Sequence, residues 1–89
     1  MGSSKDKLLH FPCRFPVKAM GRADTDFVPR VVELVRQQVP DLDDKQVATS
    51  ASRGGRYLSV TVTFTAVSQA QIDAVYRALH ADEQVVMTL

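Results

Sequence analysis

The chain has 89 residues, of which 45% are hydrophobic and 24% are charged. This composition is typical of a single globular domain and excludes an intrinsically disordered chain. The formal net charge of +1 gives no electrostatic basis for binding nucleic acid or an anionic membrane surface. The apolar runs are too short to cross a membrane, and the N-terminal MGSSKDKLLHF lacks the apolar core of a signal peptide, so we expect a cytoplasmic protein.

We expect residues 1–7 to form a flexible N-terminal tail and residues 8–89 to form one domain. Leu8, Leu9 and Phe11 resemble an arm that lies against this domain. Because the chain has one cysteine, Cys13, it cannot form an internal disulfide bond.

A first strand is predicted over about residues 15–20, where Phe15, Val17 and Ala19 alternate with other residues. Prolines mark its entrance, and Gly21 ends its pattern. A helix is predicted next, within residues 23–40, because apolar residues recur there at spacings of three and four. These residues are Phe27, Val28, Val31, Val32, Val35 and Val39. Asp24 or Asp26 can cap the helix, and Pro40 ends it.

The most regular strand pattern lies at residues 57–66, where strict alternation predicts one buried face. A weaker alternation at residues 47–52 predicts a partner strand. The Arg53-Gly54-Gly55-Arg56 segment between them is typical of a tight hairpin turn. A second helix is predicted from Ser68, with Gln71 completing a capping box, to about His80. The terminal VVMTL predicts a last short strand.

The predicted order is strand, helix, strand, strand, helix, strand. This order indicates an α+β protein: a ferredoxin-like βαββαβ sandwich with a four-stranded antiparallel sheet and both helices on one face. The first and third strands then lie at the centre of the sheet. The predicted core comprises Val60, Val62, Phe64, Val31, Val35, Ile72, Val75 and Leu79.

The pattern of reactive side chains does not favour catalysis or metal binding. His10 and Cys13 lack the second pair of ligands that a structural zinc site needs. Cys13 has no base near it in the sequence, and the carboxylates fall mainly on the exposed sides of predicted helices. We therefore predict no cofactor, no metal site and no enzymatic activity.

RNA-recognition modules share this topology and stack bases on aromatic residues of the two central strands. Here the exposed face of the third strand presents Tyr57 followed by Ser59, Thr61 and Thr63. One tyrosine does not make a stacking platform, although Lys18, Arg22, Arg53 and Arg56 form a small basic group. Binding to nucleic acid is therefore the less favoured alternative.

The turn after the first strand is the candidate ligand site, because it leads into the N-terminus of a helix, whose free amide groups attract anions. Gly21 would allow a ligand to approach closely, and Lys18 and Arg22 add positive charge. The simpler alternative is that Gly21 only makes the turn. The candidate ligand-binding residues are Lys18, Gly21, Arg22, Ala23 and Asp24.

Three segments, FPCRFPVKAMG, GRYLSVTVTFTA and VYRALHADEQVVMTL, resemble the YbeD-like family of small bacterial proteins of unknown function. The resemblance spans about residues 8–89. It implies a ferredoxin-like fold similar to the ACT regulatory domains, which bind small effectors near the turn after their first strand. Ser50 and Ser52 lie in the region of a serine pair in the family pattern, with altered spacing.

Together these features favour a non-catalytic regulatory module that binds a small anionic effector, a partner protein, or both. The alternative is a stand-alone protein-interaction domain without a metabolite ligand. Since the open face of the sheet is polar and rich in threonine, a weak homodimer suits it better than an obligate one.

Overall fold

The computed structural model describes residues 9–89, so the predicted tail over residues 1–7 and the predicted contact of Leu8 lie outside the described residues. The helices and strands of residues 9–89 follow the predicted order. They are β1 (Cys13–Arg22), α2 (Phe27–Arg36), a 3-10 helix (Asp44–Gln46), β2 (Val47–Ala51), β3 (Tyr57–Ala66), α3 (Gln69–His80) and β4 (Met87–Thr88).

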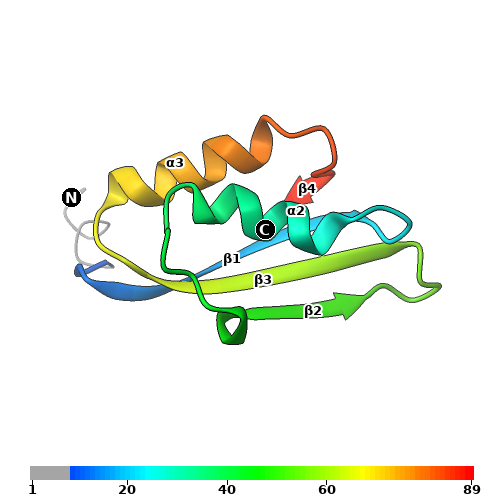
Figure 1. Ribbon diagram of the computed structural model, residues 1–89, viewed down its shortest axis with the longest axis horizontal. Helices are drawn as coiled ribbons and strands as arrows, with labels where there is room; N and C mark the ends of the chain where they lie inside the picture. The colour runs from blue at the N-terminus through cyan, green and yellow to red at the C-terminus, as the bar shows by residue number, and fades with distance from the viewer. Residues whose placement is uncertain (1–8) are drawn as a thin grey trace, which may run out of the picture.

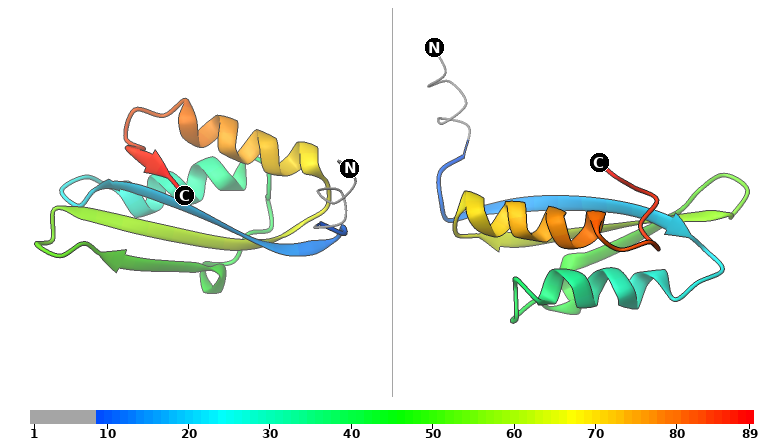
Figure 2. Two further views of the ribbon diagram at one scale, coloured as in Figure 1. Left: turned by 180° about the vertical axis from the view of Figure 1, so that it is seen from behind. Right: turned by 90° about the horizontal axis from the view of Figure 1, so that it is seen from above.

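The four strands form one antiparallel sheet in the order β2-β3-β1-β4. The two helices lie on the same face of this sheet (Figure 1), and α3 still lies above β1 and β3 when the molecule is seen from behind in the left view of Figure 2. Strand β1 pairs with β3 along the whole length of both strands, from Cys13 opposite Ala66 to Arg22 opposite Tyr57. The predicted ferredoxin-like sandwich, with the first and third strands at its centre, is confirmed.

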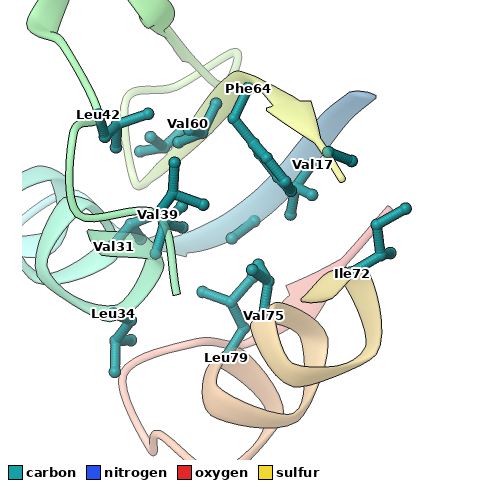
Figure 3. Packing of buried hydrophobic residues seen from close by; sticks show 14 of the residues in the cluster. Val17, Val31, Leu34, Val39, Leu42, Val60, Phe64, Ile72, Val75 and Leu79 are labelled. Carbon is teal, nitrogen blue, oxygen red and sulfur yellow. The ribbon is translucent and has the colours of Figure 1, made fainter. Parts of the chain in front are cut away.

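The core lies between the sheet and the two helices (Figure 3). All eight predicted core residues are at most 2% exposed, because alternation in β3 and helical spacing in α2 and α3 direct them inward. Seven further residues belong to the core, and five of them lie in the predicted apolar patterns: Val17, Ala19, Phe27, Val39 and Ala66. The other two do not: Leu34 broadens the buried stripe of α2, and Leu42 points inward from the connection between α2 and the 3-10 helix.

Two predicted boundaries are wrong. Strand β1 continues through Gly21 to Arg22, because Gly21 pairs with Leu58 rather than breaking the strand. Helix α2 ends at Arg36, before Pro40, because the amide groups of Gln38 and Val39 both bond to the carbonyl of Val35 and tighten the last turn.

Other local predictions are confirmed. Gly54 and Gly55 have φ angles of 97° and 74°, in the left-handed region that a tight hairpin requires. Ser68 caps α3 by accepting a hydrogen bond from the amide of Gln71. The Gln71 side chain accepts from the amide of Val67 instead of Ser68, so the capping box is shifted by one residue.

Candidate functional site

Gly21 is needed for packing inside the domain. A Cβ atom at this position would lie 2.3 Å from the ring of Phe27, which is fully buried. The space left by the missing side chain is therefore filled by Phe27 and is not open to a ligand from the helix side. This observation favours the simpler reading of Gly21, in which the residue serves the fold.

Arg22 and Asp24 bind each other. The Arg22 guanidinium donates from Nε and Nη2 to the two carboxylate oxygens of Asp24, at 3.0 and 2.7 Å. These bonds lower the pKa of Asp24 and raise the pKa of Arg22. Asp26 takes the N-cap position of α2, and its side chain makes no capping bond. Arg22, one of the two positive charges that the effector hypothesis needs for an anion, is thus already paired.

The remaining predicted site residues lie apart from each other. The amide of Ala23 donates to the carbonyl of Arg56 at 2.8 Å. Lys18 lies four residues before Arg22 in β1, a distance of about 13 Å along a strand. Lys18 therefore belongs to the face of the sheet that the helices leave uncovered, rather than to the N-terminal end of α2.

Basic residues form a row on the face of the sheet that the helices leave uncovered. Arg14, Lys18 and Arg22 recur every four residues in β1 and are all exposed. Their partners on β3 are Thr65, Thr61 and Tyr57. The four strands contain no aspartate or glutamate at all, so the acidic residues among 9–89 lie in helices and connections. We call the residues on this side of β1 and β3 the open face.

An apolar corner adjoins this basic row. Met20 lies between Lys18 and Arg22 in β1 and pairs with Met87 of β4, which is 47% exposed. Leu89, whose amide bonds to the carbonyl of Lys18, is 63% exposed. Mixed basic and apolar surface of this kind is typical of protein-binding faces.

Between the helices, Arg30 and Asp82 form the least exposed ion pair of the described residues. Arg30 Nε donates to Asp82 Oδ2 at 2.6 Å, and the Asp82 side chain is only 7% exposed. Desolvation acts to raise the pKa of Asp82, but the Arg30 bond and the Gln84 amide outweigh it and lower that pKa. The pair ties α2 to the loop after α3, and a hollow beside it is lined by Ala81, Glu83 and Gln84. Sequence reasoning did not find this pair.

Residues 9–89 contain no group of three or more His, Cys, Asp or Glu side chains arranged to hold a metal ion. Cys13 is half-buried at the start of β1, and His80 bonds to the hydroxyl of Thr88 at 2.8 Å. None of the helices that the structure describes is both long and apolar enough to span a membrane.

The fold and its uncovered sheet face define a small α+β domain of the ferredoxin-like class. Its sequence matches the family described as "Protein of unknown function (DUF493)" over residues 6–89, and the chain belongs to this family. A UPF0250 protein of Chromobacterium violaceum is 43% identical, with all of both chains covered. The UPF0250 protein NE1487 of Nitrosomonas europaea is 40% identical, with 97% of this chain and 99% of the relative covered. The predicted resemblance to the YbeD-like family is confirmed.

The solution structure of protein HP0495 from H. pylori has the same fold. It superimposes with a TM-score of 0.70 and 14% sequence identity, and it covers 91% of this chain and 85% of the other. At this identity the likeness concerns the fold alone.

Proposed function

We propose that this protein is a non-catalytic regulatory module of the cytoplasm whose open face binds an acidic surface of a partner protein. The observation that carries the proposal is the charge of that face. Exposed Arg14 and Lys18 project from β1, and no strand carries an acidic residue that would neutralise them. Arg22 continues the row, but its charge is paired with Asp24.

The chemistry between the charges also suits a protein surface. Met20 and Pro16 separate the basic residues of β1, and the hydroxyl groups of Thr61 and Thr63 lie opposite on β3. Alternating apolar and basic positions provide contact area together with charge, and hydroxyl groups can bond to backbone or side-chain groups of a partner. Charge complementarity of this kind mainly accelerates association and selects the partner, and it weakens as salt is added.

The predicted small effector is a second element of the proposal with less support. The pairing of Arg22 with Asp24 and the bond from Ala23 leave the residues 18–24 fewer free groups for an anion. A partner protein is therefore the favoured ligand.

The test compares affinity capture from a bacterial lysate by three baits: the parent protein, Lys18→Glu and Arg77→Glu. Both substitutions change the net charge equally, but Arg77 is exposed on α3, on the other side of the molecule. We expect a partner that the parent and Arg77→Glu retain, that Lys18→Glu loses, and that raised salt releases. Adding the purified partner to 15N-labelled protein should shift the amide signals of Lys18 and Thr61.

Equal retention by the Lys18→Glu bait, or shifts confined to α2 and α3, would refute the open face as the binding surface. Release of the captured material by nuclease treatment would favour nucleic acid instead. Extraction of a small molecule from the washed parent protein, without a protein partner, would favour the effector alternative.

A further inference from the structure

Strand β2 is exposed on both of its faces. Its residues from Ala48 to Ala51 are all exposed, and Val47 is half-buried. In β3, by contrast, Val60, Val62 and Phe64 are fully buried on one side. The helices cover the middle of the sheet and leave β2 along its lower margin in Figure 1. Within one copy of the chain, β2 is thus an edge strand that pairs with β3 alone.

The outer edge of β2 also has free backbone groups. The amide of Ser52 donates to the carbonyl of Tyr57, so this N–H points toward β3. Because the direction of the backbone groups alternates along an antiparallel strand, Thr49 and Ala51 direct their N–H and C=O groups away from β3. The C=O of Val47 also points away from β3, whereas its N–H donates to the carbonyl of Asp44. Edge strands are usually protected by proline, lysine or a covering element. The sequence VATSA has no proline and no charge.

The opposite edge of the sheet differs in this respect. There β4 pairs with the second half of β1, and Pro16 lies in the first half, where it has no N–H to offer. The free edge for pairing with another strand is therefore that of β2.

We propose that β2 pairs with β2 of a second copy, antiparallel, with Thr49 opposite Thr49 on a two-fold axis. In this register the two Thr49 residues bond to each other, and the C=O of Val47 in each copy accepts from the N–H of Ala51 in the other, while the Val47 N–H keeps its bond to Asp44. The side chains that meet are small and uncharged, so no like charges face each other along the strand.

The charges that flank β2 favour a second copy as the occupant. Before the strand, Asp41, Asp43 and Asp44 are exposed. Lys45 and Arg36, whose Nη2 lies 3.7 Å from Asp44 Oδ1, offset two of these charges and leave this flank net negative by one. After the strand, Arg53 and Arg56 are exposed. An antiparallel arrangement brings the negative flank of one copy toward the positive flank of the other, at both ends of the pair.

The dimer would contain one continuous eight-stranded sheet, with four helices on one side and both open faces on the other. A contact built on five residues is smaller than the 1,200–2,000 Å² of standard stable interfaces, so we expect reversible association that depends on concentration (about micromolar to millimolar). The inference does not depend on the proposed function, because the open face is not part of the contact.

The test uses charge at the two-fold axis. Sedimentation and NMR diffusion of the parent protein should show a dimer that grows with concentration. The variants Thr49→Lys and Thr49→Glu should each be monomeric, because like charges would meet on the axis, and an equimolar mixture of the two should restore the dimer. The matched pair Thr65→Lys and Thr65→Glu, which is exposed on β3 away from the edge, should dimerise as the parent does.

A parent protein that stays monomeric at the highest soluble concentration would overturn the proposal. So would a Thr49→Lys protein that still dimerises alone, or a mixture that associates no better than its components. Amide spectra of each variant establish that it is folded, since Thr49 is exposed and its outward N–H makes no bond within the chain. The Lys18→Glu protein should dimerise normally, which separates this test from that of the proposed function.

Discussion

Replacing Gly21 with Ala tests whether this residue serves the packing of Phe27. In an extended strand, alanine would normally be favoured over glycine by about 0.5–1 kcal/mol, because glycine loses more backbone freedom on folding. Here the added Cβ would lie 2.3, 2.4 and 2.7 Å from three atoms of the Phe27 ring, where ordinary contact begins near 3.4 Å. The clash therefore opposes the backbone preference.

The size of the clash decides whether Gly21→Ala raises or lowers the free energy of unfolding. Phe27 is fully buried, so its ring cannot move by about 1 Å without displacing the core around it. Such overpacking costs about 1–3 kcal/mol. Because three ring atoms would have to move, we take the upper part of this range, about 2–3 kcal/mol. After the backbone gain is subtracted, we expect Gly21→Ala to lower the free energy of unfolding by about 1–2.5 kcal/mol.

The assay is urea unfolding followed by circular dichroism, since the chain has no tryptophan. A double-mutant cycle with Phe27→Leu isolates the contact: the cost of Gly21→Ala should shrink when the smaller leucine replaces the ring. Gly55→Asn is a control, because its position has a φ of 74°, which asparagine tolerates, and nothing within 4 Å of an added Cβ. A Gly21→Ala protein as stable as its parent, or an unchanged cost in the Phe27→Leu background, would refute this role.

Three substitutions and one titration test the core, the ion pair, the thiol and the effector site. Val62→Asp should lower the free energy of unfolding by several kcal/mol (about 3 or more), measured by urea unfolding, because it buries a carboxylate without a partner. Asp82→Asn should destabilise the protein at pH 7. Because the folded pKa of Asp82 lies below its ordinary 3.8, this difference should fade only as the pH falls below 3.8 and through that folded value, which urea midpoints measured at successively lower pH would show. Cys13→Ser should leave the amide spectrum and any activity in cells largely intact, whereas loss of activity in a folded variant would contradict the non-enzymatic interpretation. Titration with carboxylates, amino acids and phosphates should shift the amides of Gly21 to Ala23 if a small anion binds there; silence at these amides would reject that site.

The elements of the fold could be predicted because each depends on a local pattern. Alternation placed β3 at its observed residues, and the helical stripes placed Val31, Ile72 and Leu79 in the core. The predicted ends of β1 and α2 were less accurate, because these ends depend on contacts between elements that the hydrophobic periodicity of a segment does not reveal. Gly21 interrupts the strand pattern in the sequence, but it pairs with Leu58, and Phe27 fills the space that a side chain would take.

The candidate site was harder to predict for the same reason. Asp24 and Asp26 are equally good caps in the sequence, and only the bidentate bond to Arg22 distinguishes them. Arg30 and Asp82 are 52 residues apart, so no local pattern relates them. The weaker alternation at residues 47–52 predicts a strand, but it does not show that the edge position of β2 leaves residues 48–51 exposed on both faces.

The charge of the open face also bears on the choice between a protein and RNA as its ligand. A net charge of +1 shows that the chain as a whole is not strongly basic. This total combines strands that carry no acidic residue with helices and connections that do. Locally the face could attract either kind of anion. Single-stranded RNA is held mainly by aromatic stacking, and along the described strands only Tyr57 offers a ring to the open face, half-buried opposite Arg22. Basic residues about 13 Å apart, with Pro16 and Met20 between them, instead match carboxylates scattered over an apolar protein surface. The spacing of the charges, more than their number, therefore favours an acidic protein partner.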